Sequence, residues 1–425
     1  MECRHGEASG THVLPVVYRT ATIVHRHDGA GRMGEAGAAT GARNARVRNP
    51  GIDLLRGLAI VLVVFNHLGL RIPLEKSALA AVLPGWLLNR LNWNGYEAVY
   101  VFFVISGFLI AGNALRRWGS LATIDARAFY ARRFARIVPC LLALLAVLSA
   151  LHLLGVQGYV IHRAGQSLPR ALLSALGLHL NWYEGRTGYL PGNWDVLWSL
   201  SIEEAFYLGF PLACLLLRRR ALLVLPLAVL ALSLPSARAA LHGNEIWLEK
   251  AYLPGMAAIA TGVLGALLAD ACRPPPRRTV AMLGWLGATG LGAVLLDGGT
   301  LWHWLRDGYM LVLTLSSLCL LLACQWRQRG GDTSPLPGFG WLRAWGRLSY
   351  EIYLSHMFVV FAVVRVWRAW GGDLVYGWLW YLPALALCWL LGVAVERWLS
   401  APCERWLRMR LAGSLSRSRM GMPAA

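Results

Sequence analysis

Long apolar runs alternate with short arginine-bearing segments along most of the 425-residue chain. After about residue 48 ten such runs follow one another, each approaching the roughly 20 residues that a helix needs to cross a bilayer core. They cover residues 53–70, 96–115, 137–156, 198–217, 221–235, 252–271, 280–297, 308–325, 349–366 and 376–395. The pattern predicts an all-α fold, a polytopic membrane helix bundle with about ten transmembrane helices.

The two ends of the chain lack this pattern. Residues 1–48 are rich in Gly, Ala, Arg and His and hold no long apolar run, so they are expected to be a disordered or mis-started N-terminal tail. The transmembrane domain is predicted over residues 49–405, and a basic C-terminal tail over residues 406–425. Glycines in the sixth and seventh runs predict close helix contacts. They are Gly262, Gly265, Gly284, Gly287 and Gly290.

Composition supports a membrane protein. The chain is 57% hydrophobic and only 15% charged, against about 25% charged in a typical soluble domain. These values exclude a disordered chain, a collagen and a small disulfide scaffold, and they make the lipid bilayer the main surroundings of the protein. The net charge of +19 comes from arginines clustered between apolar runs, so no nucleic-acid partner is expected.

The basic residues concentrate in every second loop, as the positive-inside rule requires. Both termini are therefore predicted to be cytoplasmic, in a multi-pass protein of a bacterial inner (plasma) membrane. The largest outer loop, residues 157–197, holds four large aromatic residues: Trp182, Tyr183, Tyr189 and Trp194. Such rings stack on carbohydrate, but they also anchor proteins at the membrane interface, and the sequence favours neither.

The first apolar run carries three ionisable residues on one face. Arg56 and His67 are eleven positions apart, which returns to within about 20° after three helical turns, and Asp53 lies within about 40° of His67. The helical rise per residue places His67 about 16 Å along the helix from Arg56, near the middle of a bilayer core that is roughly 30 Å thick. An ionisable group there costs about 2.5–3.5 kcal/mol. A histidine bonded to a neighbouring helix is the simpler interpretation, but the shared face favours function.

Three arginines, Arg132, Arg133 and Arg136, form a compact basic patch at the end of the loop before the third run. Two interpretations are equally open. The patch can serve topology alone, or it can bind phosphate through bidentate hydrogen bonds.

Further polar residues enter the fourth and ninth runs. Glu203 could orient a histidine or an acceptor hydroxyl, or it could be a helix N-terminal acid, and Tyr207 follows one turn later. Tyr353 and His356 lie along one face of the ninth run, where interfacial aromatics are the alternative. Ser106 is interpreted as a close-packing point. No Walker A loop, H-E-x-x-H motif or zinc-spaced Cys/His set is present, and no metal site is predicted.

Taken together, these segments resemble the acyltransferase-3 family of integral membrane acyltransferases, which includes bacterial polysaccharide and glycolipid O-acetyltransferases. The likeness covers about residues 50–405. Its parts, in order, are D-x-x-R-x10-H, F-F-x-I-S-G-F, R-R-x-x-R-I-x-P, W-S-L-x-x-E-x-x-F-Y and S-Y-x-x-Y-L-x-H. Each motif is weak alone, but five in the right order form a specific signal.

The resemblance implies an acyl-CoA, acetyl-CoA above all, as a cytoplasmic co-substrate, with no permanently bound cofactor. It implies a hydroxyl acceptor on a sugar, an exported polysaccharide or a glycolipid. It also implies that Arg56 and His67 are essential and that the arginine patch serves the donor. Many relatives add an esterase-like domain, and we expect no fused domain of that kind here.

The sequence thus predicts an O-acyltransferase. His67 would be the general base, since its usual pKa of about 6.5 suits that role, and Asp53 or Glu203 would orient it. Arg56 would bind the donor or stabilise charge, and the expected acceptor contacts are Tyr207, Tyr353 and His356. The alternative is a polytopic transporter of a lipid-linked or small polar solute, because charges inside membrane helices fit both classes.

Overall fold

The computed structural model describes residues 48–419, with side chains up to residue 411. The predicted N-terminal tail lies outside the described residues except for Arg48, and so do residues 420–425. Within the described range every regular element is a helix, which confirms the predicted all-α class.

Eleven helices have 13 residues or more. They are α2 (Pro50–Gly69), α4 (Gly95–Trp118), α5 (Ala126–Leu153), α9 (Leu197–Leu216), α10 (Arg220–Leu232), α13 (Tyr252–Ala271), α14 (Arg277–Leu305), α15 (Tyr309–Arg329), α17 (Ser349–Ala369), α18 (Tyr381–Val395) and α19 (Ala401–Arg419). The shorter α-helices are α3 (Gly85–Trp93), α6 (Leu168–Leu176), α7 (Leu180–Thr187), α8 (Gly192–Asp195), α11 (Leu234–Ala239), α12 (Glu245–Lys250) and α16 (Gly340–Arg347). Single turns are η1 (Leu74–Lys76), η2 (Ala78–Ala81), η3 (Leu121–Thr123), η4 (Arg306–Gly308), η5 (Gly377–Trp380) and the π-helical η6 (Glu396–Ser400).

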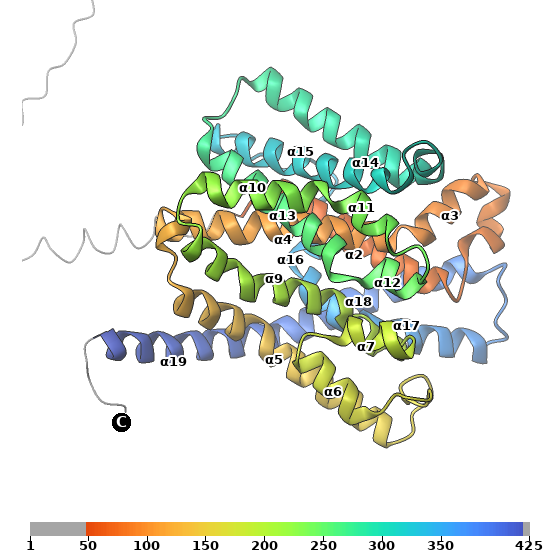
Figure 1. Cartoon of the computed structure of the whole chain (residues 1–425). Helices are drawn as coiled ribbons and strands as arrows, with labels where there is room; N and C mark the ends of the chain where they lie inside the picture. The colour runs from red at the N-terminus through yellow and green to blue at the C-terminus, as the bar shows by residue number, and fades with distance from the viewer. Residues whose placement is uncertain (1–47, 420–425) are drawn as a thin grey trace, which may run out of the picture. The chain divides into compact units, whose positions relative to one another are not determined.

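Eight stretches of the described chain are long and apolar enough to cross a membrane. One of them, Arg277–Arg329, contains both α14 and α15, which turn back at η4 and pack side by side (Figure 1). Helix α10 has 13 residues and is shorter than the length that spans a bilayer core. The helical bundle is as predicted, but its ten crossings are not confirmed.

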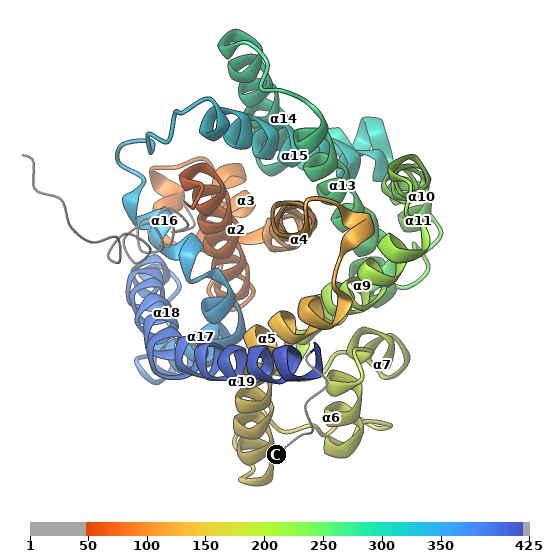
Figure 2. The ribbon, with the colours of Figure 1, turned by 90° about the vertical axis from the view of Figure 1, so that its left-hand side faces the viewer.

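Helix α4 lies in the middle of the bundle and packs most closely against α13 (Figure 2). Glycines make this approach possible. A Cβ atom at Gly107 of α4 would lie 1.9 Å from the Ile259 carbonyl oxygen, and one at Gly262 of α13 would lie 1.9 Å from the Val104 carbonyl oxygen. A Cβ atom at Gly287 of α14 would lie 2.7 Å from the Ser316 carbonyl oxygen of α15. The close contacts predicted from these glycines are therefore present.

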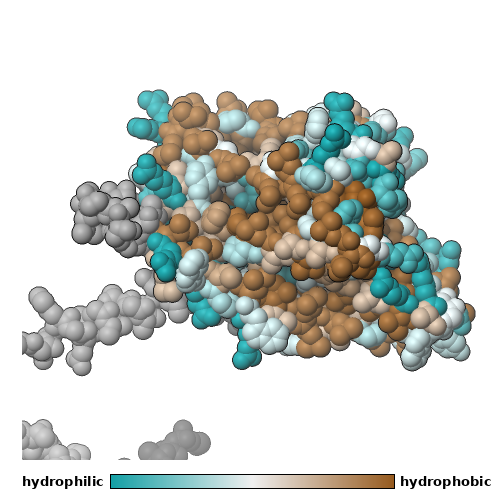
Figure 3. Space-filling view, turned by 90° about the horizontal axis from the view of Figure 1, so that it is seen from below, coloured by the Kyte–Doolittle hydropathy of each residue, from teal (hydrophilic) through white to brown (hydrophobic). Residues whose placement is uncertain are grey.

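The sides of the bundle are apolar. Leu216, Leu225 and Trp285 expose 81%, 66% and 72% of their surface, which is unusual for large apolar side chains unless they face lipid. On the face in Figure 3, hydrophobic residues fill most of the middle and hydrophilic residues gather toward the two sides. A lipid-facing surface explains this distribution.

Several predicted arginine clusters meet at one end of the bundle. Asn49 before α2 donates to the Cys324 carbonyl near the end of α15. Arg329 of α15 and Arg220 of α10 donate to carbonyls in the last turn of α13. We call this the Asn49 end, and the opposite one, where α2 finishes, the His67 end. The gathering of arginines at the Asn49 end is the arrangement that the positive-inside prediction requires.

Candidate functional site

Two histidines from distant parts of the sequence meet at the His67 end. The ring centroids of His67 on α2 and His356 on α17 are 5.1 Å apart, and the rings are tilted by 44°. Helix α2 ends at Gly69, so His67 occupies its last turn. The depth of His67 in the bilayer core stays a prediction.

His356 is fully buried, and its backbone contacts fix its tautomer. Nδ1 lies 2.7 Å from the Tyr353 carbonyl oxygen and 3.2 Å from that of Ile352. A carbonyl oxygen only accepts hydrogen bonds, so Nδ1 carries the proton and Nε2 has a free lone pair. That Nε2 atom is buried and has no hydrogen-bond partner among the described residues. The pair thus places an unused imidazole nitrogen beside His67.

The other two residues of the α2 face lie far from this pair. Asp53 precedes His67 by fourteen positions in one continuous helix, which separates them by about 21 Å. The Arg56 guanidinium donates to the Ser349 hydroxyl at 2.8 Å, at the start of α17. At its separation along α2, Asp53 cannot bond to the His67 ring, and the Glu203 carboxylate accepts a hydrogen bond from the Tyr207 hydroxyl at 3.5 Å.

Arg71, which the sequence analysis did not single out, is a cation beside the histidine pair. Its guanidinium donates to the His67 carbonyl oxygen at 2.8 Å and lies over the Phe361 ring, 4.9 Å from the centroid. Burial lowers the pKa of Arg71, and the nearby Arg368 adds to the effect. The signal for it in the sequence is its position one helical turn after His67.

The three arginines of the predicted patch lie inside α5 and not in a loop. Asp125 caps the helix by accepting from the Ala128 N–H at 3.0 Å, so α5 begins eleven residues before the apolar run. Arg132 lies over the Trp118 ring at 4.9 Å, whereas Arg133 lies over the Tyr207 ring at 3.7 Å. Arg136 is exposed. The patch therefore divides into three separate environments.

Arg133 belongs to a polar group between α4, α5 and α9. The Tyr207 and Ser106 hydroxyls are 2.6 Å apart, and the Tyr207 hydroxyl donates to Glu203 at 3.5 Å. Glu203 and Glu204 both interact electrostatically with Arg133. We call these five residues the Arg133 cluster. Ser106 thus adds a hydrogen bond to the packing role predicted for it.

One face of α17 links the Arg133 cluster to the histidine pair. Tyr350, Tyr353 and His356 are three residues apart, so each is rotated by about 60° from the one before. Tyr350 accordingly contacts α5, through the Ile137 carbonyl at 3.2 Å, and Tyr353 contacts α9, through the Ser199 hydroxyl at 2.7 Å. His356 contacts α2. The side chains predicted to lie along one face of this helix therefore point toward three different neighbouring helices.

A cavity of about 1080 Å³ lies elsewhere, between the start of α2 and helices α14, α15 and α16. Most of its lining is apolar, and none of the predicted site residues borders it. Among the described residues, no group of three His, Cys, Asp or Glu side chains could hold a metal ion. The predicted site residues lie instead on α2, α5, α9 and α17.

The match to known proteins covers this whole region. The acyltransferase-3 family model, described as an acyltransferase domain, matches residues 49–397. The chain belongs to the acyltransferase-3 family. All the predicted site residues, from Asp53 to His356, fall inside the matched range. Their individual roles stay predictions.

Two curated relatives illustrate the similarity of this acyltransferase-3 protein to others. A Staphylococcus aureus (strain COL) protein with a proposed O-acetyltransferase activity is 24% identical over 341 residues, which cover 73% of this chain and 50% of the relative. The O-acetyltransferase OatA of S. aureus (strain NCTC 8325 / PS 47) is 30% identical over 182 residues, or 40% of this chain and 25% of OatA. The chain spans about half the length, or less, of the curated relatives it matches. No solved structure matches it significantly.

Proposed function

We propose that this protein is an integral membrane O-acyltransferase. It moves an acyl group, acetyl in the simplest case, from a cytoplasmic acyl-CoA to a hydroxyl of a sugar, an exported polysaccharide or a glycolipid. The observation that carries the proposal is the histidine pair inside a family of acyltransferases. The imidazole of the half-buried His67 suits the general base of acyl transfer.

In the proposed reaction His67 takes the proton of the acceptor hydroxyl. The hydroxyl oxygen attacks the thioester carbonyl, the carbon–sulfur bond breaks, and the coenzyme A sulfur leaves with the proton that His67 returns. The products are an O-acyl ester and coenzyme A thiol. Arg71 is close enough to the histidine pair to stabilise the developing oxyanion.

The arginines at the Asn49 end are the proposed contacts for coenzyme A phosphates. Arg56 lies about 16 Å along α2 from His67, and Arg136 is exposed on α5. A coenzyme A whose phosphates stay at this end would reach the histidine pair with its extended pantetheine arm. We assign Arg136 the leading role because it is exposed, whereas Arg133 is stacked on the Tyr207 ring.

The proposal places the protein in a bacterial inner membrane with both termini in the cytoplasm. A reporter fused to the C-terminus should be active only in its cytoplasmic form. A signal from the opposite side would overturn the orientation and, with it, the donor side.

Release of free thiol from acetyl-CoA by the purified protein in nanodiscs tests the activity itself. We expect thiol to appear and the acetyl label to move to an added hydroxyl compound. The transporter alternative has no thioester chemistry, so it predicts intact acetyl-CoA. Unchanged acetyl-CoA with every hydroxyl compound offered, water included, would refute the acyltransferase proposal.

A further inference from the structure

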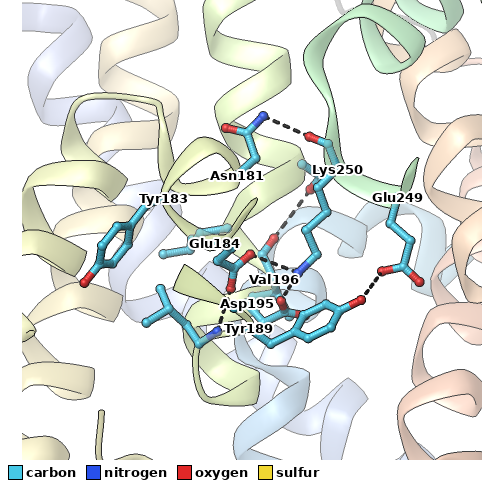
Figure 4. Close-up of polar contacts among 12 residues, drawn as sticks. Asn181, Tyr183, Glu184, Tyr189, Asp195, Val196, Glu249 and Lys250 are labelled. Atoms are coloured by element: carbon cyan, nitrogen blue, oxygen red, sulfur yellow. Dashed lines mark hydrogen bonds and ion pairs between the residues drawn. The ribbon is translucent and has the colours of Figure 1, made fainter. Parts of the chain in front are cut away.

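A buried ionic group joins three short helices at the His67 end (Figure 4). The Lys250 ammonium of α12 donates to Glu184 of α7 at 2.9 Å and to Asp195 of α8. Lys250 exposes 2% of its side chain and Glu184 none of it. We call these three residues the Lys250 cluster.

The Lys250 cluster is held rigidly. The Asn181 amide donates to the Lys250 carbonyl at 2.9 Å, and the Leu190 N–H donates to the second Glu184 oxygen at 2.9 Å (Figure 4). Burying charge costs several kcal/mol per ion, and apolar side chains of similar volume often stabilise a fold better. Such a cluster is therefore weak evidence for stability and raises the question of what it positions.

Its position is next to the histidine pair. The Tyr353 hydroxyl donates to the carbonyl of Val196, the residue after Asp195, at 3.0 Å, and the Tyr353 ring centroid lies 5.9 Å from that of His356. Helix α8 also packs directly on α17, because a Cβ atom at Gly192 would lie 2.7 Å from the Met357 side chain, one residue after His356. The cluster and the histidines thus border the same region.

Asp195 is the open member of the cluster. Its side chain is 21% exposed, and its Oδ2 atom bonds to nothing in the described part of the chain. Beside it, the half-exposed Tyr189 ring lies over Lys250 at 4.3 Å, and the Tyr189 hydroxyl donates to Glu249 at 3.1 Å. The neighbouring Asn193 is 1% exposed, and neither polar atom of its amide bonds to any described residue. Buried amides rarely stay unpaired without a ligand or water.

We propose that Asp195, held in place by Lys250 and Glu184, binds a hydroxyl of a carbohydrate acceptor beside His67. A carboxylate oxygen accepts hydrogen bonds from sugar hydroxyls, an amide both donates and accepts, and an aromatic ring packs against the apolar face of a sugar. These three kinds of group occur together in Asp195, Asn193 and Tyr189. The inference rests on the proposed function and names the acceptor side of that same site.

A second buried ion pair offers a matched control. Arg238 donates to Asp307 at 3.1 Å, and their side chains are 6% and 5% exposed. Both carboxylate oxygens of Asp307 are used, because His242 bonds the second one at 2.6 Å. Asp307 therefore resembles Asp195 in its ion pairing, but it is more buried and has no open oxygen for a ligand.

The test compares Asp195→Asn with Asp307→Asn in purified protein, with acetyl-CoA as donor. The probe acceptors are glucose, N-acetylglucosamine and their β-1,4-linked disaccharides, with water as the reference. Asp195→Asn should raise the KM for the sugar roughly 10- to 100-fold, as expected for a lost charge-assisted hydrogen bond. The KM for acetyl-CoA and the rate with water should not change. Asp307→Asn should leave all three values unchanged.

An unchanged sugar KM in Asp195→Asn, or an equal rise in Asp307→Asn, would overturn the inference. Thiol release by the wild type that no probe sugar stimulates would overturn the carbohydrate assignment. The absence of any thiol release by the wild type would instead count against the proposed function. If Asp195→Asn does not fold, Asp195→Glu keeps the charge for Lys250 but shifts the oxygens, and an unchanged sugar KM there would equally reject Asp195.

Discussion

Replacing Arg133 by alanine should mainly destabilise the protein. The guanidinium lies over the Tyr207 ring, 3.7 Å from its centre. A desolvated cation–π contact contributes about 2 kcal/mol. We therefore expect the loss of Arg133 to lower the free energy of unfolding by about 2 kcal/mol.

The matched control is Arg136→Ala. Arg136 lies one helical turn further along the same helix but is exposed, so its loss should change stability by no more than about 0.5 kcal/mol. If it binds coenzyme A phosphate, the KM for acetyl-CoA should rise instead. The free energy of unfolding of Arg133→Lys should lie between those of the wild type and Arg133→Ala, because lysine keeps the charge but cannot stack flat on the Tyr207 ring.

Unfolding in mixed micelles, titrated with a denaturing detergent and followed by circular dichroism, gives the free energy of each variant. Adding Glu204→Gln to Arg133→Ala should restore part of the lost stability, since it removes one carboxylate that the arginine compensated. Equal unfolding midpoints for Arg133→Ala and Arg136→Ala would refute this reasoning. Arg133 would then be free to contact the donor, as the sequence had suggested.

Three further predictions concern the site and its surroundings. Tyr207→Phe should lower the free energy of unfolding by about 1–3 kcal/mol because it leaves the Ser106 hydroxyl unpaired. In the same unfolding assay, the double variant with Ser106→Ala should be closer to wild type in stability. Losses of stability that simply add would contradict the pairing. Arg71→Ala should lower kcat roughly 10²- to 10³-fold in steady-state kinetics, and an unchanged kcat would exclude it as the oxyanion contact. Burial and Asp195 hold the pKa of Glu184 well above its usual range, even against Lys250. The folded protein thus keeps the Glu184 proton to higher pH than the unfolded chain, so its stability should fall as pH rises above about 4. In thermal unfolding, Glu184→Gln should make the dependence of stability on pH weaker. An equal pH dependence in the wild type and the variant would argue against this role of Glu184.

Periodicity predicted the course of α2 well. Asp53, Arg56 and His67 do share one continuous helix, because an apolar run with a 3.6-residue repeat has few alternatives in a membrane. Periodicity says nothing, however, about which helix lies opposite. The contact between His67 and His356 joins positions 289 apart, and it became visible only from the packing of α17 on α2.

The predicted start of the third helix is wrong, because the charged residues before it belong to the helix and not to a loop. Because Arg132, Arg133 and Arg136 are polar, the third helix was expected to start only at residue 137. In the structure Asp125 caps a helix that starts at Ala126, since arginine is a good helix former and its long side chain can carry charge away from the helix axis. Aromatic partners on α4 and α9 hold two of these arginines, and no local pattern shows such partners in advance.

The Lys250 cluster had no signal of its own. Its ion pairs join positions 66 and 55 apart, and they come from three helices of four to eight residues between the longer helices. Neither hydrophobic periodicity nor motif spacing predicts contacts between such short elements. Only the rarity of lysine sets Lys250 apart in the sequence, because Lys76 is the one other lysine of the chain.

The kcat for thiol release from acetyl-CoA by His67→Ala tests the central proposal most directly. His303→Ala is the matched control, because His303 is an exposed histidine on α14, next to Trp304 and outside the site. Both variants should reach wild-type levels and unfold at the same midpoint. His67→Ala should lose roughly 10²- to 10⁴-fold in kcat, while His303→Ala keeps the wild-type value. A His67→Ala protein as active as the wild type would contradict the assignment of His67 as the base.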